Sequence, residues 1–321
     1  MSKFQNKVIE IKRDNSANQY FQINWMLHDK CSYRCSYCPP TNHDGDDSWL
    51  KIDQVIKTCE TIKQKVYQRN PNLKMQILFN GGEPTLWKDF SNLIGYLDQE
   101  NWSLHMVTNL SRSLLWWKNL NIRWDYLSAS FHSEYANVNE FIEKCQYLQD
   151  YANVLNIRVM IPPDQKLFDL TTSILDRFRS EVPLATIQCI PILFEFGGTT
   201  IPLSPYTPAQ LEKINKLLDF KGKPNKNNTK MVTWDDNTTV YIDSNKIVNQ
   251  GLNKFKNWSC DAGIDGIFIN SQGTIFRGTC MEGGELGNII KNDFDLPNES
   301  IICGADTCVC VTDVLYSKKL I

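Results

Sequence analysis

The sequence predicts an α/β fold, a partial (β/α)6 TIM-like barrel followed by a small C-terminal α+β domain. Three observations predict it. Six short apolar runs alternate with longer amphipathic segments, this alternation stops after about Pro205, and the cysteines gather in two groups separated by a long stretch with few of them. Strands that alternate with helices favour a parallel sheet with right-handed crossovers.

The alternation defines the elements of the expected barrel. The six candidate strands are Tyr20–Leu27, Met75–Asn80, Ser103–Thr108, Trp124–Phe131, Asn156–Ile161 and Thr186–Leu193. The amphipathic segments between them are approximately Asp53–Arg69, Trp87–Gln99, Ser113–Leu120, Val138–Ala152 and Gln165–Ser180. In a curled sheet of this kind the active site lies at the C-terminal ends of the strands.

These patterns divide the chain into three parts. Residues 1–205 form the expected barrel, and residues 206–257 a linker with a helix near Pro208–Leu218 and an exposed loop at Lys221–Lys230. Residues 258–321 are rich in glycine, with short β-like runs at Gly266–Asn270 and Thr274–Phe276. We expect a smaller, metal-stapled domain there.

The composition excludes several classes of protein. The 34 basic and 36 acidic residues give a net charge of -2, which provides no electrostatic reason for a nucleic-acid or membrane-surface partner. The N-terminus lacks an apolar signal core, and no stretch approaches the roughly 20 apolar residues that span a bilayer. We therefore expect a cytoplasmic protein. Its 11 cysteines are an odd number in a reducing compartment, so metal sites are favoured over disulfides.

The first cysteine group directly follows the first candidate strand. Cys31, Cys35 and Cys38 have the spacing Cys-x3-Cys-x2-Cys, which offers three soft thiolates to an iron–sulfur cluster or to zinc. Three ligands on a four-iron cube leave one iron open to a substrate-like molecule. The alternative is a structural zinc site, for which His28 or His43 would supply a fourth ligand.

Polar motifs follow the next candidate strands. Gly81-Gly82-Glu83-Pro84 comes directly after the second, where adjacent glycines allow close approach of the backbone and a carboxylate could accept hydrogen bonds from an ammonium group. The third strand ends at Thr108-Asn109-Leu110. A plain Gly-Gly turn is the alternative for the first of these motifs.

The spacing of Cys31, Cys35 and Cys38, with Tyr37 before the last cysteine, resembles the signature of the radical S-adenosylmethionine (SAM) superfamily. The resemblance covers roughly residues 20–195. It implies that a [4Fe-4S] cluster on these cysteines binds and splits SAM into a 5'-deoxyadenosyl radical. It further implies that the cofactor is bound by Tyr37, Gly81, Gly82, Glu83, Pro84, Thr108, Asn109, Ser130, Arg158 and Ile161. Leu110 departs from the glycine that the family has there.

The second cysteine group resembles the SPASM and twitch extensions of some radical SAM enzymes. Its five members are Cys260, Cys280, Cys303, Cys308 and Cys310. A full SPASM extension uses seven cysteines, so one auxiliary [4Fe-4S] cluster of the twitch type fits better, with four of the five as ligands. A ribbon-like zinc staple is the alternative.

Three further side chains are candidates for chemistry on the substrate. His132 and Glu134 follow the fourth strand and could act as acid or base, or could instead cap a helix or orient SAM. Cys189 on the sixth strand could donate a hydrogen atom, although a lone buried cysteine is more often a small hydrophobe.

Together these features predict an enzyme that abstracts a hydrogen from a small molecule or peptide, for dehydrogenation, epimerisation or bond formation. The chemistry implies a flavodoxin- or ferredoxin-type electron donor. Only about 20 residues precede the first strand, which favours a small molecule or a leader-independent peptide over a leader-guided maturase of ribosomal peptides. A non-catalytic, zinc-stapled binding protein is the rival from another class.

Overall fold

The computed structural model describes residues 7–12, 19–192, 206–218, 229–308 and 310–321. Most of the predicted loop Lys221–Lys230, and Leu193 at the end of the sixth candidate strand, lie outside these ranges. The chain forms two compact units, each assembled from separate stretches. The first comprises residues 1–25, 53–76 and 224–321, and the second residues 26–52 and 77–223.

The second unit contains the sheet expected for the barrel. Its strand order is β2-β3-β4-β5-β6-β7, and the pairs from β4 to β7 are parallel. The strands are β2 (Tyr20–His28), β3 (Lys74–Gly81), β4 (Ser103–Thr108), β5 (Tyr126–Phe131), β6 (Leu155–Ile161) and β7 (Thr186–Pro191); β2 and β3 enter this unit with their C-terminal residues.

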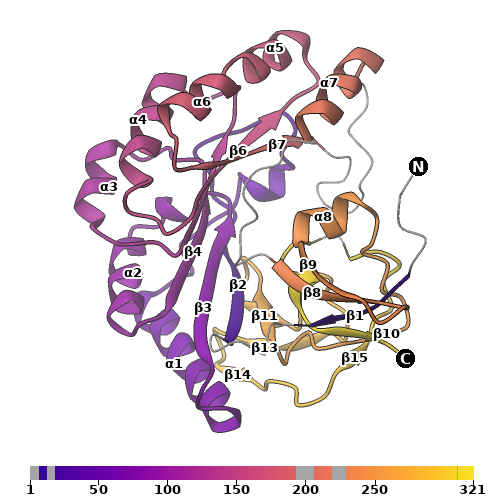
Figure 1. Ribbon diagram of the computed structural model, residues 1–321. Coiled ribbons are helices and arrows are strands. Elements are labelled where there is room, and N and C mark those ends of the chain that lie inside the picture. Colours follow the sequence, from indigo (N-terminus) through magenta and orange to yellow (C-terminus); the bar gives the residue numbers. More distant parts are fainter. Residues whose placement is uncertain (1–6, 13–18, 193–205, 219–228, 309) are drawn as a thin grey trace. The chain divides into compact units, whose positions relative to one another are not determined.

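Helices connect these strands and lie along one side of β4 to β7 (Figure 1). They are α2 (Phe90–Gln99), α3 (Leu114–Leu120), α4 (Val138–Leu148), α5 (Gln165–Ser173), α6 (Leu175–Glu181) and, after β7, α7 (Pro208–Leu218). Their starts follow from local chemistry, since Ser113, Asn137 and Asp164 cap α3, α4 and α5 with side-chain oxygens. The segment predicted as one helix from Gln165 to Ser180 is divided at Ile174 into α5 and α6.

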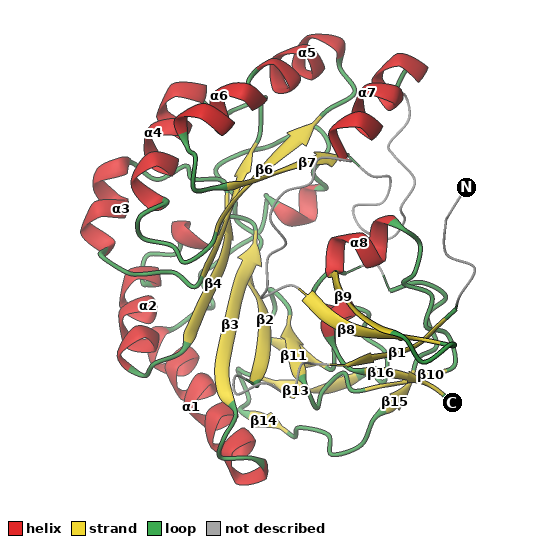
Figure 2. Cartoon of the chain, in the orientation of Figure 1, coloured by secondary structure: helices red, strands yellow, loops and turns green. Residues whose placement is uncertain are grey.

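In its described residues, the first unit contains two sheets and two α-helices. One sheet has the order β15-β10-β16-β1-β8-β9, and in the other β14-β13-β12-β11 continues onto β2 (Figure 2). The helices are α1 (Ile52–Arg69) and α8 (Ser244–Asn249). The strands are β1 (Val8–Lys12), β8 (Thr229–Trp234), β9 (Thr239–Asp243), β10 (Trp258–Cys260), β11 (Gly266–Ile269), β12 (Thr274–Phe276), β13 (Glu285–Asn288), β14 (Asp293–Phe294), β15 (Ile301–Ile302) and β16 (Lys318–Leu320).

The first unit differs from the predicted division of the chain. The expected linker, residues 206–257, contributes the hairpin β8–β9 and helix α8. The N-terminal strand β1 pairs with β8 on one side and with the C-terminal strand β16 on the other. A small domain at residues 258–321 is therefore an incomplete description, because the sheet also needs strands from the N-terminus and the expected linker.

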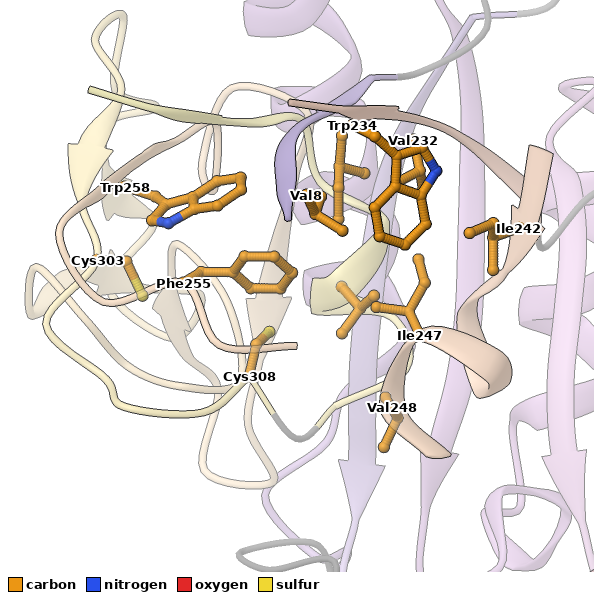
Figure 3. Close-up of a cluster of buried hydrophobic side chains, with 12 residues drawn as sticks. Val8, Val232, Trp234, Ile242, Ile247, Val248, Phe255, Trp258, Cys303 and Cys308 are labelled. Carbon is orange, nitrogen blue, oxygen red and sulfur yellow. The ribbon is translucent and has the colours of Figure 1, made fainter. Parts of the chain in front are cut away.

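A buried apolar cluster forms the interior of this sheet region. Figure 3 shows Val8, Val232 and Trp234 from the strands together with Phe255 and Trp258. Cys303 and Cys308 belong to the same cluster. Two cysteines of the second group are thus part of a packed core.

Within the described residues, we find no helix with the length and hydropathy that crossing a bilayer requires.

Candidate functional site

The first cysteine group lies in the loop directly after β2. Cys35 is buried, and Cys31 and Cys38 are half-buried. Main-chain bonds shape the loop, with Cys38 N donating to Cys35 O at 2.9 Å and Cys31 N donating to His43 O at 3.2 Å. Burial raises the pKa of Cys35 to about 12 and that of Cys38 to about 11. These thiols are therefore protonated at neutral pH unless a metal displaces the protons.

The two glycines after β3 bring their backbone against the start of this loop. Gly82 N donates to His28 O at 2.9 Å, and Glu83 N donates to Lys30 O at 2.8 Å. A Cβ on Gly81, whose φ is 115°, would stand 2.5 Å from His28 O, and one on Gly82 would stand 2.2 Å from Lys30 O. Only glycine permits this approach, so the motif is more than a plain turn.

The carboxylate of Glu83 is fully buried and bound by the chain itself. Its Oε1 accepts from Thr85 Oγ1 at 2.6 Å, Thr85 N at 3.3 Å and Thr108 Oγ1 at 2.9 Å, and its Oε2 accepts from Asn109 N at 2.7 Å. Burial raises the pKa of Glu83, and these donors oppose the rise. All four of these donors come from the chain, and the expectation that this carboxylate also accepts bonds from an ammonium group stays a prediction.

Asn109 connects the three motifs. Its main-chain N–H binds Glu83, and its side-chain Nδ2 lies 3.5 Å from Cys31 Sγ and 3.3 Å from Ser32 Oγ. The end of β4, the loop after β3 and the cysteine loop therefore share one hydrogen-bonded arrangement.

Leu110 replaces the glycine of the family motif but keeps its backbone conformation. Its φ is 55°, in the left-handed region that costs most residues about 1–2 kcal/mol. Its side chain is buried, and its carbonyl accepts from Lys144 Nζ at 2.9 Å. These contacts hold the leucine in a left-handed conformation at the position where the family has glycine.

The loop after β5 also binds the cysteine loop through hydrogen bonds. Glu134 accepts from Ser36 N at 2.8 Å and from Ser36 Oγ at 2.6 Å. His132 Nδ1 lies 2.8 Å from Tyr37 Oη and 3.5 Å from Cys35 Sγ. Burial, and then the charge of Arg158, lower the pKa of His132 to about 4, so its imidazole is neutral at pH 7.

Two tyrosines outside the predicted set of site residues add further contacts between these loops. Tyr33 stacks on Tyr135 with ring centroids 5.2 Å apart, and Tyr135 Oη donates to Arg34 O at 2.9 Å. The only sequence signal for them was their place beside the cysteines and beside Glu134. This arrangement favours an orienting role for His132 and Glu134, one of the two alternatives left open above.

The register of β5 to β7 separates a polar face from an apolar one. Ser130 pairs with Arg158, which pairs with Gln188, and one step earlier Ser128 pairs with Asn156. Directly paired residues share a face of the sheet. Nε of Arg158 is buried without a hydrogen-bond partner among the described residues. Ser130 and Arg158 thus stand together as a hydroxyl and a cation on the polar face.

Cys189 and Ile161 lie on the opposite face. Cys189 pairs with Val159, and the charge of Arg179 on α6 acts on its thiol. Burial raises the pKa of Cys189 to about 11. The side chain of Ile161 is fully buried, and its carbonyl accepts from Tyr206 Oη. This placement favours the core interpretation of Cys189 and leaves only the main chain of Ile161 for a ligand.

The second cysteine group gathers around a buried carboxylate in the first unit. Asp313 Oδ2 accepts from Thr279 Oγ1 at 2.6 Å and from Cys280 N at 3.2 Å, and its Oδ1 has no partner among the described residues. Cys310 Sγ lies 2.7 Å from Thr312 Oγ1. Cys303 and Cys308 are buried beside Phe255 (Figure 3).

Neither group converges on a single point. Across the ranges that the structure describes, no three or more His, Cys, Asp or Glu side chains gather closely enough to hold one metal ion. Thiolates on a four-iron cube each bind a different iron, so they need not meet at one point.

Similar proteins were found both by sequence and by structure, whereas no protein-family model matches the chain. GTP 3',8-cyclase of Haemophilus influenzae (strain 86-028NP) is 25% identical over 142 residues, which is 40% of either chain. The S-adenosylmethionine-dependent nucleotide dehydratase of Selenomonas ruminantium is 29% identical over 98 residues, covering 29% of this chain and 31% of that protein. The chain thus spans about two fifths or less of these curated relatives.

Solved structures share the fold over most of the chain. The structure of anSMEcpe with bound AdoMet superposes with a TM-score of 0.51 at 16% identity, covering 85% of this chain and 79% of that one. Streptococcus suis SuiB bound to the precursor peptide SuiA gives a TM-score of 0.50 at 16% identity, covering 87% and 66%. These likenesses confirm the mixed α/β class.

Proposed function

We propose that the chain is a radical SAM enzyme in which Cys31, Cys35 and Cys38 hold a [4Fe-4S] cluster at which SAM is split reductively. One observation supports this most strongly. Asn109 contacts Cys31 Sγ with its side chain and Glu83 with its main chain, so the three family motifs form one site. The strand order β2 to β7 supports the partial (β/α)6 barrel that would carry it.

The donor set fits an iron–sulfur cluster with an open iron. The cysteine loop supplies three soft thiols, and the loops around it supply hydrogen bonds and aromatic cover. When bound, the cluster supplies the electron that releases a 5'-deoxyadenosyl radical from SAM. Asn109, Tyr37 and Glu134 hold the cysteine loop in place, and the neutral His132 keeps added positive charge away from Cys35.

SAM would be held by groups with complementary charge. The amino group of SAM would lie at the Gly81-Gly82-Glu83 turn, where the Glu83 carboxylate, which already accepts bonds from Thr108 and Asn109, and main-chain oxygens are the acceptors. Arg158 would pair with the carboxylate of SAM. Ser130 beside it would bind that same carboxylate or the ribose of SAM. The main chain near Ile161 would contact adenine. Thr108 and Pro84 shape the loops, because Thr108 binds Glu83 and Pro84 is buried.

The second cysteine group would hold one auxiliary [4Fe-4S] cluster. Five thiols lie in one unit, two of them in the same apolar cluster. Beside them, Oδ1 of the buried Asp313 has no hydrogen-bond partner among the described residues. Four of the five cysteines would be ligands, in a twitch-like arrangement.

The substrate of this site would be a small molecule or a peptide. The cyclase and dehydratase among the relatives are named for nucleotide substrates, and SuiB has been solved with a precursor peptide. The reaction would remove a hydrogen atom from an unactivated C–H bond. A flavodoxin- or ferredoxin-type protein would supply electrons.

Anaerobic incubation with dithionite and SAM tests the proposal. We expect 5'-deoxyadenosine, about eight irons and sulfide per chain in the reconstituted protein, and loss of the product in Cys38→Ala. Deuterium transfer from labelled candidate substrates would then identify the hydrogen that is taken. One or two zinc ions without sulfide would instead support a zinc-stapled binding protein.

A further inference from the structure

Lys318, on β16, is a buried cation that forms an ion pair with no carboxylate of the described residues. The residue is 4% exposed. Its Nζ donates to the main-chain oxygens of Asp313 and of Tyr316, the latter at 3.1 Å. An ammonium group has three donors, so one remains. Among the described residues it forms no ion pair, and burying an unpaired charge is costly.

The position of Lys318 points to the missing negative partner. In the antiparallel register of β10 and β16 it stands directly opposite Cys260, and directly opposite side chains lie roughly 4.5–5.5 Å apart at Cβ. Its Nζ lies 5.4 Å from the ring centroid of Phe255, which packs in the apolar cluster with Cys303 and Cys308. The cation is thus placed among thiols of the second group.

Its charge already acts on these thiols. Burial raises the pKa of Cys260 and of Cys308, and in both cases the charge of Lys318 is the largest opposing influence. Burial likewise raises the pKa of Asp313, and the charge of Lys318 opposes that rise as well.

We propose that Lys318 is the counter-charge of the auxiliary cluster and stabilises its reduced form. This inference rests on the auxiliary cluster proposed above. Reduction adds one electron, and hence one negative charge, to a centre that already carries four thiolates. A fixed cation in a water-poor surrounding favours the added charge and raises the reduction potential. Lys318 is a positioning residue in this sense, since it need not touch the substrate.

The experiment isolates the auxiliary cluster by using a parent with Cys31→Ala, Cys35→Ala and Cys38→Ala. In this parent we compare Lys318→Gln, Lys318→Met, Lys318→Arg and the control Lys319→Met. Lys319 is the exposed neighbour on the same strand, so its loss changes the net charge equally. Iron and sulfide are counted first, and the midpoint potential is then measured by EPR during a dithionite titration.

We expect about four irons in the parent. The neutral variants at position 318 should shift the ratio of reduced to oxidised cluster at least about tenfold toward the oxidised form, a potential about 59 mV lower. Lys318→Arg and Lys319→Met should stay within about threefold of the parent.

The outcomes separate two failures. A parent without iron and sulfide overturns the auxiliary cluster and this inference with it. A parent with four irons whose potential is the same in Lys318→Gln and Lys319→Met overturns the inference alone. If the neutral variants do not fold, pulsed EPR of the parent labelled with ¹⁵N-lysine decides instead, because a counter-charge beside the cluster gives a nitrogen coupling that Lys318→Arg removes. A coupling that is absent, or unchanged in Lys318→Arg, contradicts the inference.

Discussion

Replacing Glu83 with glutamine tests whether the buried carboxylate organises the SAM site. The change keeps the shape but turns one oxygen into an N–H donor. The amide nitrogen would take the place of Oε2, which faces one donor, Asn109 N, because Oε1 faces three. The variant therefore breaks the link between the loop after β3 and the end of β4.

The magnitude follows from the bonds that are lost. A hydrogen bond to a charged group contributes about 1.5–3 kcal/mol, and two facing donors leave a buried group unsatisfied at a further cost of about 1–3 kcal/mol. Removing the buried charge recovers part of this free energy, because burial disfavours the charged form of Glu83, as its raised pKa indicates. We expect a net cost of about 2 kcal/mol to the SAM-competent arrangement, which is about thirtyfold in the Kd for SAM.

The assay is equilibrium binding of SAM to the anaerobically reconstituted protein, with 5'-deoxyadenosine formation measured in parallel. Glu143→Gln is the matched control, because Glu143 is exposed on α4. Its Kd should stay within twofold of the unaltered chain. A Glu83→Gln variant that binds SAM as tightly as Glu143→Gln would show that the carboxylate does not organise the site.

Three further changes have defined outcomes. Cys35→Ala should lose the iron of the first cluster and all 5'-deoxyadenosine, whereas Cys59→Ala, a buried helix cysteine, should keep both; equal iron in the two variants would contradict the ligand assignment. Glu134→Gln weakens two bonds to Ser36 at the partly exposed edge of the loop, about 1 kcal/mol, so a chelator should remove iron about fivefold faster; a rate equal to that of Glu143→Gln argues against this contact. Burial lowers the pKa of His105 to about 4 from 6.5, so the unfolded chain binds the proton first and stability is lost as the pH falls from 6.5 toward 4. Between pH 7 and pH 5, the free energy of unfolding measured in urea should fall by about 2 kcal/mol more for the unaltered chain than for His105→Gln. Parallel losses in the two proteins would disprove this.

Local patterns predicted the second unit well. Periodicity alone placed the strand at Ser103–Thr108 and the helix at Pro208–Leu218 with the bounds that the structure has. It did not predict β1 or the hairpin β8–β9. Strands β1 and β8 are stabilised by pairing with distant segments, since β1 pairs with both β8 and β16.

The sequence pointed to the loops of the candidate site but not to the contacts between them. The spacing of the cysteines and the glycine pair identified the loops, since such chemistry needs those residues close together in sequence. The binding of Glu83 by Thr108 and Asn109, about 25 residues away, has no local signal. The stacking of Tyr33 on Tyr135 is a contact across about 100 residues and had none either.

The sequence by itself determined the resemblance to the radical SAM superfamily, the two groups of thiols and the alternation of strands and helices, because each depends on residues near one another along the chain. Only the tertiary structure decided that Glu83 is bound by its own chain, that Leu110 keeps a left-handed backbone and that Lys318 stands buried opposite Cys260. Burial and charge at these positions are set by packing between distant segments, and packing is a property of the folded chain that no local pattern records.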